Sequence, residues 1–376
     1  MERRRSSVEI AERDAVLGLW AIPGVGPVAL SEIRRVMGGA LGPIADVPVR
    51  EWLNRIVLPD VPRAWLSSVT TLRELSGLLR DRARETQMRI QYLGEDGYPG
   101  KLAEIADAPP VLFSRGRVGV EGRRVAVVGS RHPEHGCERY LRGIVEELAR
   151  GGLCVVSGAA YGLDAMAHHA ALDVGGETWA FMASGLDELD APQASLAGRI
   201  IESGGRVLTE YPPGVRPDRP NFPRRNRLIS GVADAVVILR GKLRSGSMHT
   251  AEHALRQGRL LFAVPGNFWN ETAQGCVELI RRGAARLCTR GADVLEALGV
   301  VVERMAGTRP PGRGLDELEL SEAARRAHGA LGTGPRVLEE IQSHSGLEPS
   351  ELVCALAELE LSGLAVQHPG RVYEKA

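Results

Sequence analysis

The chain has 376 residues, and its 47 Lys and Arg balance 47 Asp and Glu, so its formal net charge is zero. Without a basic excess, any role in binding nucleic acid must rest on local charge. Five scattered cysteines without a CxxC pair, no apolar run of membrane-spanning length and no signal-peptide core favour a soluble, cytoplasmic protein with reduced thiols.

Residues 1–87 are expected to form a helical N-terminal domain that is interrupted by Gly and Pro turns. Within it, Ile22–Pro27 reads IPGVGP between two helical stretches, which is typical of a helix-hairpin-helix motif. Its glycine turn would expose backbone N–H groups that bind a DNA phosphate without reading the sequence. An ordinary turn between two core helices explains the same residues equally well.

Residues 88–300 change in character, because short β-branched apolar runs here alternate with helical stretches. This alternation predicts an α/β fold with a mostly parallel sheet that is covered by helices on both faces. The predicted strands are Ile90–Leu93, Val111–Phe113, Val125–Val128, Cys154–Val156, Thr178–Met182, Arg206–Leu208, Ala235–Leu239 and Leu260–Val264.

Residues 301–333 include the Pro- and Gly-rich run Met305–Gly314 and are predicted to be a linker. Residues 334–376 then show two short amphipathic helices and a hairpin, the order of a winged-helix-like domain. Its would-be recognition helix carries Glu351, Glu358 and Glu360 but no Lys or Arg. This charge argues against DNA reading by the domain and favours contact with a protein.

Two of the predicted strands end in turns that suit phosphate groups. Gly129, Ser130 and Arg131 follow one strand, and Ser157 and Gly158 follow the next. Both turns lead into helices, which places N–H groups and positive helix ends at the carboxyl edge of a parallel sheet. The first turn alone is also explained as a plain strand-to-helix connection, and the second strengthens the phosphate interpretation.

Four further residues after the second turn have local interpretations. Gly162 is a second turn candidate there, and Asp164 either caps the following helix or orients Arg131, with capping favoured. Neighbouring His168 and His169 must face different ways on a helix, so at least one is expected to be structural.

An arginine-rich segment, Pro220–Arg227, reads PNFPRRNR and combines an aromatic ring with guanidinium groups. Stacking and phosphate pairing together are the usual physics of binding to single-stranded nucleic acid. The predicted contact residues of this segment are Phe222, Arg224, Arg225, Asn226 and Arg227. The alternative is an arginine-rich helix start that is held in ion pairs with the protein itself.

A fourth loop begins at Ser245, Gly246 and Ser247, whose free N–H groups would head a helix and suit an anion. His249, Glu252 and His253 on this helix match the H-x-x-E-H pattern of a zinc peptidase. A catalytic zinc needs a third protein ligand, and the sequence offers none nearby, so we expect no metal. A P-loop is also missing, and we predict no cofactor.

Together these residues resemble the DprA/Smf DNA-processing family. The resemblance covers roughly residues 98–298 and rests on short motifs in one order: YPGKLAEIADAPPVLFSRG, VAVVGSR, VVSGAAYGLDAMAHHAAL, ASGLDELDAP, GRVLTEYPPG, NFPRRNRLISG, SGSMHTAEHAL, GRLLFAVPGN and ELIRRGA. Its members have an extended Rossmann-like domain, form homodimers, bind single-stranded DNA and load RecA onto it during natural transformation; they are not known as hydrolases. The chain departs from the family pattern at Tyr161, Asp190, Arg240 and Val277.

The resemblance therefore implies a non-catalytic mediator that protects incoming single-stranded DNA and loads RecA, with RecA and a second copy of the chain as partners. One alternative is a nucleotide-processing enzyme of the phosphoribohydrolase type, in which Asp164 and Glu210 would serve as carboxylates. The chain shows no PGGxGTxxE signature of that class. A pure interaction scaffold is a third possibility, but it leaves the arginine cluster unexplained.

Overall fold

The computed structural model describes residues 2–22, 24–53, 71–119, 122–133, 137–266, 269–300, 320–332, 334–361, 364–368 and 372–375. Contacts divide the chain into two compact units, Met1–Val301 and Val302–Ala376. The predicted fold class is confirmed, because a large, mostly parallel sheet, N-terminal helices and a winged-helix domain are all present. The predicted boundaries at residues 87, 300 and 333 stay predictions.

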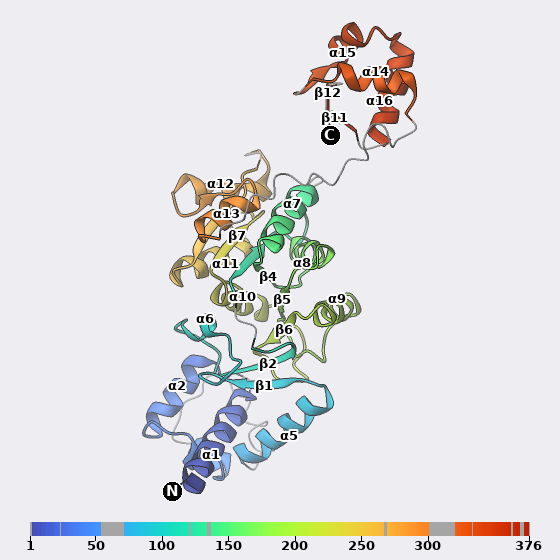
Figure 1. Ribbon diagram of the computed structural model, residues 1–376. Helices are drawn as coiled ribbons and strands as arrows, with labels where there is room; N and C mark the ends of the chain where they lie inside the picture. Colours follow the sequence, from blue (N-terminus) through green and yellow to red (C-terminus); the bar gives the residue numbers. More distant parts are fainter. Residues whose placement is uncertain are drawn as a thin grey trace. The chain divides into compact units, whose positions relative to one another are not determined.

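The first unit is built on a nine-stranded sheet of order β1-β2-β6-β5-β4-β3-β7-β8-β9 (Figure 1). Strands β3 to β9 are parallel to one another. Strand β2 pairs with β6 in the antiparallel direction, and β1 pairs with β2 in the antiparallel direction as well. The strands are β1 Arg89–Tyr92, β2 Val111–Gly116, β3 Arg124–Val128, β4 Cys154–Ser157, β5 Thr178–Phe181, β6 Arg206–Thr209, β7 Ala235–Ile238, β8 Leu260–Ala263 and β9 Arg286–Leu287. Strands β3 to β7 are buried along their whole length, as expected for a parallel sheet covered on both faces.

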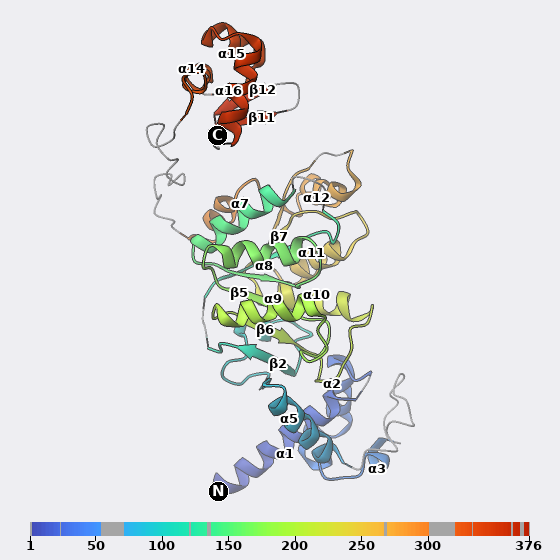
Figure 2. The same ribbon diagram turned by 90° about the vertical axis from the view of Figure 1, so that its right-hand side faces the viewer.

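Helices cover both faces of this sheet (Figures 1 and 2). Alternate strand residues separate the two layers: Val125 and Val127 pack with α7, α8 and α13, whereas Ala126 and Val128 pack with α6, α10 and α11. The helices are α6 Gly100–Ala103, α7 Cys137–Arg150, α8 Leu163–Asp173, α9 Ala191–Glu202, α10 Asn221–Val232, α11 Gly246–Arg256, α12 Glu271–Arg281 and α13 Gly291–Ala297. The sheet is thus closed to solvent on its faces, and polar loops gather at the strand ends.

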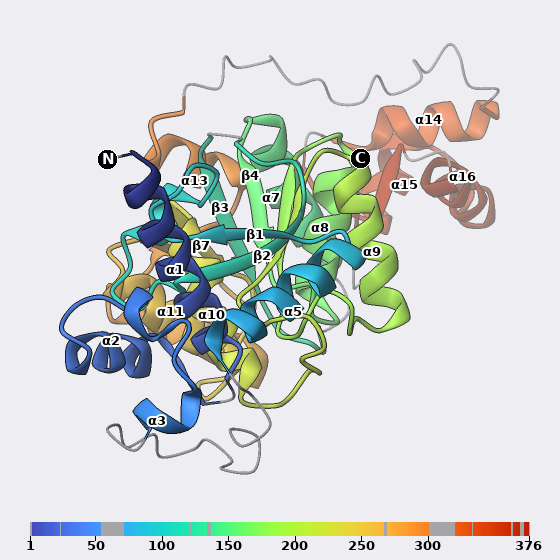
Figure 3. The same ribbon diagram turned by 90° about the horizontal axis from the view of Figure 1, so that it is seen from below.

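The N-terminal helices lie beside β1 and β2 and share a hydrophobic core with them (Figure 3). They are α1 Glu2–Trp20, α2 Pro27–Val36, the 3-10 helix η1 Gly42–Ile44, α3 Val49–Leu53 and α5 Leu72–Glu85. Asp14 of α1 is 1% exposed and binds Arg73, Ser76 and Arg80 of α5, which fixes the two helices together. Trp20 donates its indole N–H to the carbonyl oxygen of Glu210, 2.6 Å away, and so connects α1 to the loop after β6.

The second unit has the helices and hairpin of a winged-helix domain. Its helices are α14 Glu322–Ala330, α15 Leu338–Ser345 and α16 Pro349–Leu361, and a three-stranded sheet joins β10 Arg336–Val337, β11 Ala365–His368 and β12 Val372–Lys375. Helix α14 lies inside the segment that the sequence predicts as a linker, and its alanines pack in the core of this unit. Glu358 accepts hydrogen bonds from the backbone and hydroxyl of Ser321 at the start of α14, so this acidic residue has an internal partner.

Candidate nucleic-acid interface

The four loops that the sequence singles out meet at the carboxyl ends of the parallel strands. After β3 the chain adds β4, β5 and β6 on one side, and then β7 and β8 on the other. In open α/β sheets, ligands bind outside the carboxyl ends at such a reversal of strand order. The loops after β3, β4 and β7 therefore surround the expected ligand position.

Glycines allow the loops after β3 and β4 to pack against each other. A Cβ atom on Gly129 would lie 2.4 Å from Leu163 Cδ1, and one on Gly162 would lie 2.5 Å from the carbonyl oxygen of Arg131. Gly162 also has a φ of +87°, which confirms it as a turn residue. The backbone N–H of Leu163 donates to the carbonyl oxygen of Ser130 at 3.1 Å and closes the contact.

The Asp164 carboxylate binds backbone N–H groups of both loops. Its side chain is buried, and Oδ1 lies 3.4 Å from the backbone N of Gly129. Burial raises the pKa of the Asp164 carboxyl, and the nearby Arg225 guanidinium and the backbone N–H groups of Gly129 and Gly158 partly offset this effect. The carboxylate is thus neither a helix cap nor a partner of Arg131: it binds the N–H groups of Gly129 and Gly158 that the sequence offers to a phosphate.

Arg131 and Phe222 bring the loop after β3 to the start of α10. The guanidinium of Arg131 lies over the Phe222 ring, 4.6 Å from its centroid. Arg131 and Arg224 are exposed, and Phe222 is half-buried. A flat aromatic ring with two solvent-facing guanidinium groups beside it is suited to nucleotide bases and phosphates.

The other two arginines of α10 are buried. Arg225 donates to the carbonyl oxygens of Gly158 and Phe181 and so bridges the ends of β4 and β5, and burial lowers its pKa to about 10. Arg227 forms ion pairs with Glu210 at 2.7 Å and with Asp107 at 3.0 Å. The ion-pair alternative therefore describes Arg227, and the guanidinium groups of both residues are bonded to the protein itself.

The start of α11, after β7, is the last of the four segments at the carboxyl edge of the sheet. The Asn226 side-chain amide donates to the carbonyl oxygen of Gly246 at 3.2 Å and links α10 to α11. Ser247 is buried and donates to the carbonyl oxygen of Arg240, whereas Ser245 is half-exposed and Gly246 exposed. Ser157 is buried and its hydroxyl donates to the carbonyl oxygen of Val127, which places it inside the sheet edge.

Arg244, in the loop before α11, is an exposed cation that the sequence interpretation did not single out. It lies one residue before Ser245 and adds a third exposed guanidinium at this edge. The signal that could have found it is its position beside the Ser-Gly-Ser turn.

His249 and Glu252 of the H-x-x-E-H segment are exposed, and the His249 Nδ1 lies 3.8 Å from a Glu252 oxygen. Within the part of the chain that the structure describes, no three His, Cys, Asp or Glu side chains are grouped to hold a metal ion. In the same part, no helix is both long and apolar enough to cross a membrane.

His168 is a fully buried structural residue beside the amino end of β5. Its Nδ1 lies 2.7 Å from the hydroxyl of Thr178, and this hydroxyl donates to the carbonyl oxygen of Val155. The imidazole therefore donates Nδ1–H to Thr178. Burial lowers the pKa of His168 to about 3 from the ordinary 6.5.

This shift predicts a loss of stability in mild acid. Because the unfolded state binds the proton more tightly, the contribution of neutral His168 is complete above pH 6.5 and declines as the pH falls toward 3. Between neutral pH and about pH 5 we expect the free energy of unfolding to fall by about 2 kcal/mol through this residue. Urea unfolding at the two pH values should show the fall in the parent chain and a smaller one in His168→Gln. An equal fall in both would assign the acid sensitivity to other groups.

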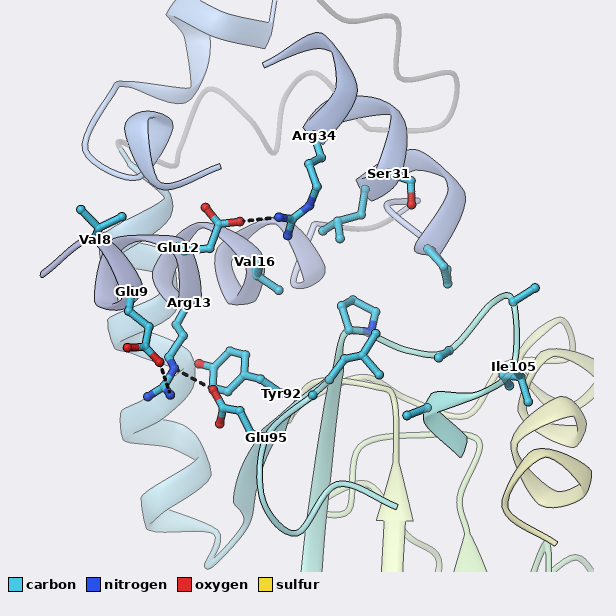
Figure 4. Close-up of a pocket in the computed structure, with 18 residues that line it drawn as sticks. Val8, Glu9, Glu12, Arg13, Val16, Ser31, Arg34, Tyr92, Glu95 and Ile105 are labelled. Atoms are coloured by element: carbon cyan, nitrogen blue, oxygen red, sulfur yellow. Dashed lines mark hydrogen bonds and ion pairs between the residues drawn. The ribbon is translucent and has the colours of Figure 1, made fainter. Parts of the chain in front are cut away.

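A cavity of about 1150 Å³ lies elsewhere, between α1, α2 and the loops that flank β1 and β2 (Figure 4). Its arginines are paired with neighbouring acids: Arg13 lies 2.7 Å from Glu95, and Arg34 lies 2.8 Å from Glu12. The cavity therefore lacks the exposed cations of the strand-end loops. The helix-hairpin-helix prediction for the turn between α1 and α2 includes Pro23, which lies outside the described residues, and it stays a prediction.

Comparison with known proteins identifies the family. A family model described as DNA recombination-mediator protein A matches residues 89–299, and a model of the DprA winged helix domain matches residues 311–371. The chain is 42% identical over 288 residues to the putative DNA processing protein DprA of Mycobacterium tuberculosis (strain CDC 1551 / Oshkosh), covering 75% of this chain and 73% of that protein. The chain belongs to the DprA family.

Two solved DprA structures are similar in fold. The X-ray structure of DprA from Streptococcus pneumoniae gives a TM-score of 0.54 at 31% identity and covers 72% of this chain and 98% of that chain. The DNA processing protein A of Helicobacter pylori, described for its single-stranded DNA binding mode, gives a TM-score of 0.50 at 27% identity, covering 56% and 95%. The resemblance drawn from the sequence is confirmed.

Two of the four departures from the DprA pattern contact each other. The Tyr161 hydroxyl donates to an Asp190 carboxylate oxygen at 2.9 Å, and the same carboxylate caps α9 by accepting from the backbone N of Gln193. Arg240 is buried and donates to the carbonyl oxygen of Leu239 at 2.8 Å. Val277 is half-buried in α12.

Proposed function

We propose that the protein binds single-stranded DNA across the strand-end loops and acts as a non-catalytic mediator of DNA recombination. The observation that carries this proposal is the exposed Arg131 guanidinium stacked on Phe222, with Arg224 on the same helix start. Guanidinium groups neutralise backbone phosphates, and the ring of Phe222 gives a base a surface on which to stack. The family membership and the DNA binding described for the Helicobacter pylori relative support the same assignment.

The site residues divide into two groups in this proposal. Direct contact with DNA is assigned to residues with exposed or half-exposed groups: Ser130, Arg131, Phe222, Arg224, Arg244, Ser245 and Gly246. Positioning of the loops is assigned to residues whose polar groups bind the protein or whose small size allows close packing: Gly129, Ser157, Gly158, Arg225, Asn226, Arg227 and Ser247.

The environment of two carboxylates favours this function over the nucleotide-processing alternative. Asp164 and Glu210, the carboxylates that such an enzyme would use, are both about 5% exposed. Asp164 accepts hydrogen bonds from the loops and Glu210 is paired with Arg227 at 2.7 Å. A general acid or base must reach the reacting group, and both side chains are buried and bonded to the protein itself.

Family membership extends the proposal to the biological process. We infer that the protein acts in natural transformation, protects incoming single strands, loads RecA onto them and works as a homodimer in the cytoplasm. Sedimentation of the purified chain tests the dimer. Assembly of RecA on single-stranded DNA, timed with and without the protein, tests the loading step, and an unchanged assembly time would contradict it.

The binding itself should prefer single strands and respond to salt. Three exposed arginines, Arg131, Arg224 and Arg244, would each neutralise one phosphate and release counterions. For three contacts the affinity should drop about 20-fold between about 50 and 200 mM salt. Fluorescence anisotropy with a labelled oligothymidylate and a matched duplex measures both properties. Equal affinity for the duplex, or binding that ignores salt, would contradict the proposed function.

A further inference from the structure

Exposed aromatic side chains are concentrated at the carboxyl edge of the sheet. Among the residues that the structure describes, the exposed aromatics are Tyr140, Tyr161 and Trp269, at 65%, 58% and 77%. Tyr140 lies in α7 after β3, Tyr161 in the loop after β4, and Trp269 between β8 and α12. Burying an indole ring is more favourable than leaving it in water. A tryptophan this exposed is therefore unusual.

Trp269 is connected to the proposed DNA site through the loop after β7. The next residue, Asn270, caps α12 by accepting from the backbone N of Thr272 at 2.9 Å. The start of α12 is in turn held to that loop, because the Gly241 N–H donates to the Thr272 carbonyl oxygen at 2.6 Å and Lys242 pairs with Glu271 at 2.7 Å. The exposed Trp269 is therefore next to a helix start that is bonded to the loop after β7.

The residues between Phe222 and Trp269 suit the same ligand. Arg244 is exposed and Leu243 is 56% exposed in the loop after β7. The loop lies between α10 and the start of α12, since Asn226 binds Gly246 and Gly241 binds Thr272. Two strand spacings, about 10 Å, separate the ends of β3 and β8, which is within the reach of one short single strand.

We propose that Trp269 is a second base-stacking platform, which extends the single-strand site from the Arg131–Phe222 stack to the start of α12. The strand crosses the ends of β3, β7 and β8, with Arg244 neutralising a phosphate between the two aromatic groups. This inference rests on the proposed function and adds the length of the site and the course of the strand. Aromatic platforms accept any base, so the extension carries no sequence preference.

Binding to oligothymidylates of increasing length, from about 4 to about 20 nucleotides, tests the platform, because single-strand sites span roughly 4–16 nucleotides. In the parent chain, affinity should rise with length until both aromatic groups are engaged. Trp269→Ala should reach its plateau at a shorter length and bind the longest oligomer on the order of tenfold more weakly, the usual effect of one stacked base. Trp269→Phe, which keeps a ring, should recover most of the affinity, and Leu78→Ala, an exposed apolar side chain on α5, should bind as the parent chain does.

Intrinsic fluorescence gives a direct readout of stacking. Trp20, Trp52 and Trp179 are at most 7% exposed, and Trp65, which lies outside the described residues, is replaced by Phe in every sample. DNA should quench the emission of the parent chain, and Trp269→Phe should abolish this quenching while it still binds. An unchanged plateau length in Trp269→Ala, or quenching that persists in Trp269→Phe, would overturn the proposal and leave the Arg131–Phe222 site standing. Failure of the parent chain to bind any oligothymidylate would overturn both.

Discussion

Replacing Arg225 by Ala is expected to lower the free energy of unfolding by about 3–5 kcal/mol, because a second buried charge loses the positive group that compensates it. The side chain is 3% exposed and donates to the carbonyl oxygens of Gly158 and Phe181. Its removal leaves these acceptors without their donor and leaves Asp164 buried without the nearby positive charge. Chemical denaturation of the purified variants measures the loss.

Arg224→Ala is the matched control, because the neighbouring residue is exposed and its loss should change stability by no more than about 0.5 kcal/mol. Combining Arg225→Ala with Asp164→Asn removes the uncompensated charge, so the double variant should be more stable than the sum of the single effects predicts. Equal stability of Arg224→Ala and Arg225→Ala would show that the buried guanidinium does not support the loops.

Replacing Arg131 by Ala should weaken binding to single-stranded DNA by about 10- to 100-fold, as expected for a hydrogen-bonded contact between a guanidinium and a phosphate. The side chain is exposed and lies over Phe222, so its loss removes a positive charge and the contact that the ring makes with it. Arg131→Lys should recover only part of the affinity, because an ammonium group lacks the planar fork that contacts a phosphate twice. Anisotropy titrations at one fixed salt concentration measure all three chains.

Stability separates a binding effect from a structural one. Arg131→Ala should melt within a few degrees of the parent chain, since the guanidinium lies outside the core. Arg84→Ala on α5, another exposed arginine outside the strand-end loops, should bind DNA as the parent does. If Arg131→Ala instead unfolds far below the parent temperature, the residue is structural and its assignment to DNA contact fails.

Periodicity was sufficient to predict the framework of the fold. All eight predicted strands are present, because apolar runs of three to five residues that alternate with helical stretches are typical of the strands of an α/β sheet. Strand β9 was missed because it has only two residues, Arg286 and Leu287, and both are exposed. Helix α14 was missed because its sequence, EAARRAHGA, buries small alanines and shows little apolar contrast.

The sequence singled out the loops of the candidate site, but it could not separate their exposed side chains from their buried ones. Arg224, Arg225 and Arg227 look equivalent in the sequence, yet only Arg224 is exposed. Which guanidinium turns inward depends on partners far away in the chain: the Gly158 carbonyl for Arg225, and Glu210 for Arg227. Asp164 was similarly ambiguous, because its contact with Gly129 crosses 35 positions of the chain. Local patterns carry no information on such contacts.

The core that α1 and α5 share with β2 determines how the chain can be shortened. A fragment that spans only residues 89–299, the stretch matched by the family model, would keep all nine strands and lose the N-terminal helices. Val111 and Phe113, both 0% exposed in the whole chain, would then lose their cover, and the Glu210 carbonyl would lose the indole of Trp20. Bare apolar surface of this kind drives aggregation, so the smallest well-behaved fragment should begin at the N-terminus and end near residue 300.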